Sequence, residues 1–96
     1  MDYVKYIEII KELKRQGKHD EAVEILLKCV NATEDEDKQN GWGVAPWYYE
    51  QLAIIYKKEG DRDKEIEILR RYQKQRKAPG TMPEKLKQRL EKILNS

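Results

Sequence analysis

The sequence has no phenylalanine, one cysteine, one histidine and no long apolar run. The lone Cys29 has no partner for an internal disulfide, and with His19 it falls short of the four ligands of an ordinary zinc site. No stretch approaches the roughly 20 apolar residues that span a bilayer, and the N-terminus lacks the basic-then-apolar pattern of a secretion signal. We therefore expect a cytoplasmic protein without a metal, a cofactor or a membrane segment.

Charged residues are abundant instead. Lys, Arg, Asp and Glu make up 40% of the 96 residues, and apolar residues make up 39%. This length is too short for two separate cores, and the composition suits thin helical layers with solvated outer faces. Residues 1–48 carry seven basic and ten acidic side chains, whereas residues 49–96 carry thirteen and eight. A single all-α domain over residues 1–96, with an acidic and a basic half, is predicted.

The first part of the chain has helical periodicity. Residues 4–13 contain an apolar stripe formed by Tyr6, Ile9, Ile10 and Leu13. Gly17 ends this helix, and Asp20 is the expected N-cap of a second helix. The inward residues of the second helix are Ala22, Val23, Leu26, Leu27 and Val30. The turn between them is so short that the two helices should form an antiparallel hairpin.

The second half repeats this layout after an irregular segment. The polar residues 31–40 are compatible with an extension of the second helix, whereas residues 41–46 contain two glycines and a proline and cannot be regular helix. Pro46 opens a third helix, which Gly60 closes. The stripe of this third helix is Tyr49, Leu52, Ala53 and Tyr56, and that of the fourth helix is Ile66, Leu69 and Tyr72.

One more helix is expected at the end. The segment from Thr81 to Glu84 matches a capping box in which the threonine is the N-cap. It precedes a helix whose apolar side is formed by Met82, Leu86, Leu90, Ile93 and Leu94. The prediction is therefore five helices and no strand.

The two hairpins are copies of one another, and they resemble the tetratricopeptide repeat family. Gly17 aligns with Gly60 at an offset of 43 residues, which exceeds the family period of about 34 and places an insertion near residues 31–45. The matching residues of the second copy are Tyr49, Leu52, Ala53 and Tyr56, and those of the first are Tyr6, Ile9, Ile10, Leu13, Ala22, Leu26 and Cys29. The second copy departs from the pattern at Glu65, which aligns with Ala22, and at Tyr72.

The resemblance implies an α-α hairpin superhelix of the tetratricopeptide type. Repeat 1 would cover about residues 3–36, repeat 2 about residues 46–79, and a capping helix about residues 82–95. Such repeats generally need about three units to bury their inner faces, so a two-fold homodimer is also expected.

The resemblance further implies a non-catalytic protein-interaction module, a scaffold or adaptor that binds a peptide or a partner helix in a groove. The groove residues carried over from the family are Val4, Ile7, Lys11, Lys14, Arg15, Trp47, Glu50, Ile54, Lys57 and Lys58. This stripe is apolar at one end and basic at the other, so it suits an acidic segment with an apolar anchor. Ile7 and Lys11 stand where the chaperone-tail binders of the family have Lys and Asn, so a tail clamp is not expected.

Other interpretations remain for these residues. The groove lysines could be a solvated face. Accessory nucleic-acid binding is the alternative function, although it is less favoured because acidic residues interrupt the basic patch and no recognition motif accompanies it. That patch consists of Arg70, Arg71, Lys74, Arg76, Lys77, Lys85, Lys87, Arg89 and Lys92. An enzyme is not expected, because no nucleophile and base, phosphate loop or carboxylate pair can be assembled.

Three further features have simple structural explanations. Trp42 is expected to pack against the first hairpin, since a solvent-exposed loop rarely contains two tryptophans, although an exposed aromatic binding surface is the other interpretation. Cys29 is expected to be a buried apolar residue. The acidic run Glu34 to Asp37 lacks the spacing of a calcium loop, so it is predicted to be a solvated helix end.

Overall fold

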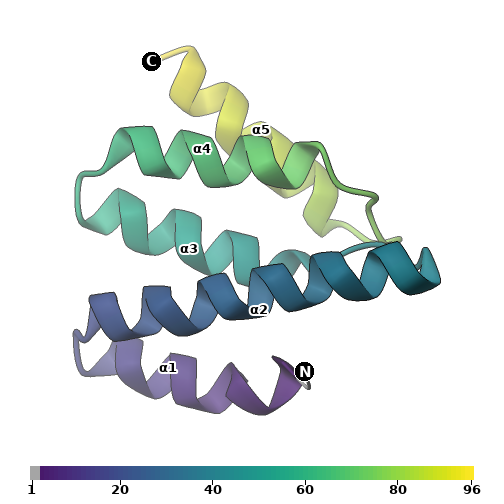
Figure 1. Cartoon of the computed structure of the whole chain (residues 1–96). Helices are drawn as coiled ribbons and strands as arrows, with labels where there is room; N and C mark the ends of the chain where they lie inside the picture. The colour runs from purple at the N-terminus through teal and green to yellow at the C-terminus, as the bar shows by residue number, and fades with distance from the viewer. Residues whose placement is uncertain (1–2) are drawn as a thin grey trace.

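The computed structural model describes residues 3–96 (Figure 1). A short 3-10 helix, η1 (Tyr3–Tyr6), is followed by α1 (Ile7–Arg15), α2 (His19–Asn40), α3 (Pro46–Lys58), α4 (Arg62–Gln73) and α5 (Met82–Leu94). The prediction of an all-α fold with five helices and no strand is confirmed for these residues.

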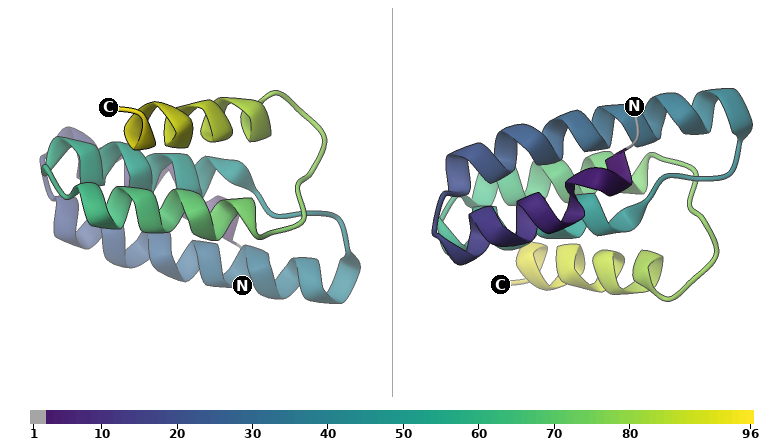
Figure 2. Two further views of the ribbon diagram at one scale, coloured as in Figure 1. Left: turned by 90° about the horizontal axis from the view of Figure 1, so that it is seen from above. Right: turned by 90° about the horizontal axis from the view of Figure 1, so that it is seen from below.

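The helices form a stack of hairpins. Figure 1 shows α1 to α4 lying side by side in chain order, with each helix running opposite to the one before it. Figure 2 shows α5 on the side of the α3 and α4 hairpin that faces away from α2. The resulting body measures 35 × 32 × 19 Å. Helix α3 therefore lies at the centre, between the first hairpin and the last two helices.

The two hairpin corners have the same geometry. Gly17 and Gly60 both adopt φ +73°, a left-handed conformation that favours glycine. The N–H of Lys18 donates to the carbonyl of Leu13 at 2.9 Å, and the residue after Gly60 makes the equivalent bond at the same distance. This is the Schellman pattern of helix termination. The internal repeat seen in the sequence thus corresponds to a repeated backbone turn.

Of the two predicted N-caps, Asp20 is wrong, and Thr81 is the N-cap residue of α5 as predicted but lacks the side-chain hydrogen bond of a capping box. The first turn of α4 is capped by Asp61, whose carboxylate accepts from the N–H of Lys64 at 3.1 Å. By contrast, α2 already begins at His19, so Asp20 lies inside its first turn and acts there only through its charge. Thr81 makes no side-chain cap, because its backbone is helical (φ −89°, ψ −18°) and not extended as an N-cap requires.

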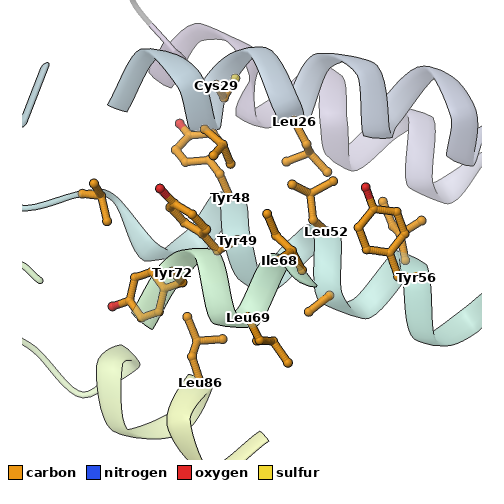
Figure 3. Close-up of a cluster of buried hydrophobic side chains, with 14 of the residues drawn as sticks. Leu26, Cys29, Tyr48, Tyr49, Leu52, Tyr56, Ile68, Leu69, Tyr72 and Leu86 are labelled. Carbon is orange, nitrogen blue, oxygen red and sulfur yellow. The ribbon is translucent and has the colours of Figure 1, made fainter. Parts of the chain in front are cut away.

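The core is built around α3. Seven of its 13 residues are buried, and they lie on most sides of the helix: Tyr48, Tyr49, Gln51, Leu52, Ala53, Ile55 and Tyr56. Figure 3 shows Tyr48, Tyr49, Leu52 and Tyr56 of α3 in one cluster with Leu26 of α2, Leu69 of α4 and Leu86 of α5. Cys29 is fully buried in the same cluster, as predicted. Only one stripe of α3 remains for contact with another molecule.

At the two ends of the stack, some residues that were predicted to face inward are exposed or half-buried. Ile9 is 47% exposed and Leu94 is 46% exposed, although both were predicted to face inward. In α4 the predicted Leu69 and Tyr72 are buried together with Ile68, whereas the predicted Ile66 is only half-buried. Helices α1 and α5 have neighbours on one side only, so a single row of their side chains is fully covered.

The insertion is anchored by residues other than Trp42. The extension of α2 to Asn40 is confirmed, but Trp42 is 71% exposed, so its predicted packing against the first hairpin is wrong. The adjacent Val44 is fully buried instead, and its N–H donates to the carbonyl of Arg76 at 2.9 Å. The side chain of Thr33 accepts from the next N–H, also at 2.9 Å. The space between the segment after α2 and the segment after α4 holds the small branched side chain of Val44, and an indole would not fit there.

Candidate functional site

Five of the predicted groove residues lie on the uncovered stripe of α3, which we call the α3 face. Trp47, Glu50 and Ile54 are half-buried, and Lys57 and Lys58 are exposed. They are spaced by three or four residues, so consecutive members lie one helical turn apart. The α3 face thus runs from an apolar end near Pro46 to a basic end at the Gly60 corner.

The apolar end of the α3 face is held in place by stacked aromatic rings. The indole of Trp47 meets the ring of Tyr48 edge to face, with centroids 5.1 Å apart. Tyr48 in turn contacts the ring of Tyr3 at 5.3 Å and donates from its hydroxyl to the carbonyl of Tyr3 at 3.0 Å. Such ring pairs contribute about 0.5–1.5 kcal/mol each beyond area burial. Trp47 is therefore a positioned, partly exposed apolar surface.

Lys14 connects α1 to the α3 face. Its ammonium group donates to the side-chain carbonyl of Gln51. Burial lowers the pKa of Lys14, and the nearby positive charge of Lys58 lowers it further, while Glu50 acts in the opposite direction. The structure thus brings Lys14 together with the basic end of the α3 face, as the sequence predicted.

The remaining predicted residues of α1 and η1 stay apart from the α3 face. Lys11 lies 3.6 Å from Glu8, and Arg15 pairs with Glu12, so each bonds within its own helix. Neither side chain bonds to α3 within residues 3–96. Val4 is 61% exposed on the 3-10 helix. The unpaired positive charge of the predicted groove therefore lies mainly on α3. The exposed ion pairs of Lys11 with Glu8 and of Arg15 with Glu12 add little stability.

A cleft beside the α3 face adds basic residues from α5. It has a volume of about 460 Å³, and we call it the α5 cleft. Its lining comes from α3, α4, α5 and the C-terminal end: Lys57, Glu65, Lys85, Gln88, Arg89, Lys92, Ile93 and Ser96. Lys57 belongs to both surfaces, and Lys85 lies 4.0 Å from Glu50 of the α3 face. The two surfaces are therefore continuous.

Glu65 forms the floor of the α5 cleft. It is only 5% exposed, and its Oε2 lies 3.5 Å from the Nε of Arg89, whose side chain is 28% exposed. In the sequence, Glu65 is a departure from the repeat pattern and Arg89 is one member of a basic patch. A carboxylate at a position where the first hairpin has Ala22 signals a need for a cationic partner. The spacing of Lys85, Arg89 and Lys92 on one face of α5 was the second available signal.

Two carboxylates of the acidic run at the end of α2 form hydrogen bonds and ion pairs with other parts of the fold. Arg71 of α4 donates twice to the carboxylate of Glu34, at 2.8 Å each, and Tyr49 donates to it at 2.7 Å. Asp37 accepts from the N–H of Gly43 at 2.8 Å and lies 3.4 Å from Arg76. The prediction of a solvated helix end is therefore wrong for Glu34 and Asp37. Arg71 lies 37 residues from Glu34 in the sequence, where local pattern gives no indication of it.

This arrangement predicts a stability change at low pH. Burial by itself would raise the pKa of Glu34, but the hydrogen bonds from Arg71 and Tyr49 and the charge of Arg71 outweigh it, so the pKa lies below its ordinary value of 4.5. The native state then binds fewer protons than the unfolded state, and its stability should fall as the pH drops below 4.5 through the lowered pKa. Urea denaturation across the acid range should show this fall, and it should be smaller in Glu34→Gln.

Glu24→Gln is the matched control, because Glu24 lies on the same helix with an exposed side chain. It should keep the acid dependence of the wild type. An equal acid dependence in the wild type and in Glu34→Gln would show that the Glu34 network contributes no pH-dependent stability.

Metal binding, membrane insertion and cysteine chemistry can each be compared with the described residues. Residues 3–96 bring together no group of three His, Cys, Asp or Glu side chains that could hold a metal ion. None of their helices is both long and apolar enough to cross a bilayer. Burial raises the pKa of the Cys29 thiol, which fits an inert core residue.

Comparison with protein-family models, with curated proteins and with solved structures gives no match for this chain. Its function is therefore argued from the geometry of the α3 face and the α5 cleft.

Proposed function

We propose that this chain is a non-catalytic protein-interaction module of tetratricopeptide-like architecture. In this proposal the α3 face, with Lys14 on one side and the α5 cleft on the other, binds an acidic peptide or a partner helix. Half-buried Trp47 and Ile54 supply apolar contact area, and the lysines attract the acidic partner.

The observation that carries the proposal is the uneven burial of α3. This helix is the centre of the core on its other sides, yet it leaves one stripe open, where Ile54 lies one turn from Lys57 and Lys58. The repeated hairpin corners and the order of the helices are what a tetratricopeptide-like stack requires. A rigid helix with an open apolar and basic stripe suits peptide recognition, because little ordering is needed on binding.

Nucleic-acid binding is less well supported by the same geometry. Two arginines of the basic patch already pair with carboxylates, namely Arg71 with Glu34 and Arg76 with Asp37. Binding that depends on phosphate contacts should weaken steeply with salt, whereas a peptide held by an apolar anchor should lose little affinity. Once a ligand has been identified, its dissociation constant measured at increasing salt concentration therefore distinguishes the two functions.

The proposal is tested by selecting binders from a displayed library of random peptides against the whole chain. Enriched peptides should combine an apolar residue with acidic neighbours. Ile54→Ser should weaken their binding by about tenfold or more, because the apolar anchor loses its contact. Fluorescence anisotropy measures the dissociation constants, and circular dichroism checks that the variant remains folded.

Ile66→Ser is the matched control, because Ile66 is half-buried like Ile54 but lies on α4. It should leave the dissociation constant unchanged. Equal loss in both variants, or enrichment of peptides that bind Ile54→Ser as well as the wild type, would rule out the α3 face as the binding surface.

A cytoplasmic location and a two-fold homodimer remain part of the proposal. Exposed apolar residues at the two ends of the stack, Ile9 on α1 and Leu94 on α5, support self-association.

A further inference from the structure

We infer that the α5 cleft is a subsite for one carboxylate side chain of the bound peptide. The inference rests on the proposed function, and it adds a second recognition element to it. In this arrangement an acidic residue of the peptide lies in the α5 cleft while a nearby apolar residue lies against Ile54 on the α3 face.

The charge of the cleft favours an anion. Four cationic side chains line it, from Lys57, Lys85, Arg89 and Lys92, against the single carboxylate of Glu65. Lys57 and Lys92 make no ion pair with any residue in 3–96, and Lys85 lies 4.0 Å from its ion-pair partner Glu50. Grouped like charges on a cleft wall raise the local concentration of the opposite charge. The cleft therefore attracts an acidic group.

The floor of the cleft holds the guanidinium of Arg89 in position. Glu65 is more than nine-tenths buried and lines the cleft, and its carboxylate faces the Nε edge of Arg89 at 3.5 Å. Within residues 3–96 neither the Oε2 of Glu65 nor the Nε of Arg89 has a hydrogen-bond partner, so the two groups form an ion pair without a hydrogen bond. A guanidinium placed by its charge beside one carboxylate can offer its terminal N–H groups to a second carboxylate in a planar, two-bond arrangement. This observation is independent of the net charge of the cleft.

The same residues favour a peptide over a nucleic acid. Glu65 lines the cleft and Glu50 lies outside it, 4.0 Å from Lys85, so a phosphate backbone that continued from the cleft onto the α3 face would meet both carboxylates. A single carboxylate needs only the space between Arg89 and the lysines. The half-buried Ile93 on the same wall contacts the apolar part of a Glu or Asp side chain. The lining thus matches an isolated acidic residue in an otherwise mixed sequence.

The position of Lys57 sets the spacing in the peptide. It lines the α5 cleft and lies three residues after Ile54, so the two subsites are about one helical turn apart. An extended peptide advances about 3.3 Å per residue. The acidic residue should therefore lie within about three residues of the apolar anchor.

The test is an NMR titration of the ¹⁵N-labelled full chain with two synthetic peptides of equal length. One has a Leu flanked by Glu residues, and the other has Gln in place of every Glu. We expect the Glu peptide to shift the amides of α5 around Arg89 as well as those of α3, and to bind about tenfold more tightly than the Gln peptide. Lys57→Gln combined with Lys92→Gln should remove this preference for Glu.

Arg70→Gln combined with Lys74→Gln is the matched control, because it removes the same charge from the outer surface of α4. This variant should keep the preference for the Glu peptide. Tighter binding of the Glu peptide with amide shifts confined to α1 and α3 would overturn the subsite and leave the proposed function intact. Equal affinity for both peptides would overturn the subsite and also the acidic preference of the proposed function. Absence of binding by either peptide would overturn both. An oligothymidylate that competes with the Glu peptide for the α5 amides and binds more tightly would assign the cleft to nucleic acid.

Discussion

Gly43→Ala is expected to destabilise the fold by about 2–4 kcal/mol, an unusually large effect for the addition of one methyl group. A Cβ at Gly43 would lie 2.4 Å from the backbone nitrogen of Ala78 and 2.8 Å from the carbonyl carbon of Lys77. These are backbone atoms, so they cannot turn aside as a side chain would. The residue also has φ +92°, which other residues rarely adopt.

The cause is the close packing of two loops that join different helices. The N–H of Gly43 donates to Asp37 at 2.8 Å, and that of Val44 donates to Arg76 at 2.9 Å, so the chain crosses the loop after α4 at close range. Gly60→Ala is the matched control, because Gly60 has a positive φ but open space around it. It should cost only about 1 kcal/mol. Equal midpoints of urea unfolding for the two variants would mean that the loops do not pack in this way.

Arg89→Met is expected to destabilise the fold by about 2–4 kcal/mol, although most of the long side chain is kept. The substitution leaves Glu65 more than nine-tenths buried without its cation. An unpaired buried carboxylate loses hydration that no protein group replaces. Thermal and urea unfolding of the full chain measure the loss. The partial exposure of Arg89 makes this loss smaller than it would be for a fully buried ion pair.

The double variant Glu65→Ala with Arg89→Met tests this cause. It should recover most of the lost stability, because the first hairpin has Ala22 at the same place and buries it fully. Glu65→Ala alone should cost about 1 kcal/mol or less, because Arg89 can extend its charged end into solvent. A double variant as unstable as Arg89→Met would show that Arg89 stabilises the fold through packing and not through Glu65.

Local signals in the sequence were sufficient for the helices and for the corners between them, although not for the side-chain caps. An apolar residue at every third or fourth position predicted each helix, and Gly17, Gly60 and Pro46 marked corners and a start that the structure also has. These residues work through their own backbone preferences, which depend little on the rest of the chain. The extension of α2 to Asn40 was predictable for the same reason.

Burial at the edges of the stack was not predictable in this way. Periodicity shows that Ile9 and Leu94 belong to an apolar stripe, but it does not show whether another helix covers that part of the stripe. Trp42 was predicted to be buried from its residue type alone, whereas the space between the two loops holds Val44. The available volume depends on a loop more than 30 residues later in the chain.

The candidate site likewise has one part that the sequence predicted and another that depends on the tertiary structure. Helical spacing placed Trp47, Ile54 and Lys57 on one stripe of α3, and the structure has them there. The α5 cleft and the carboxylate networks arise from contacts between helices far apart in the sequence, such as Glu65 with Arg89 and Glu34 with Arg71. Charged side chains are compatible with water or with an ion pair at many positions, so only the arrangement of the helices determines which of them meet.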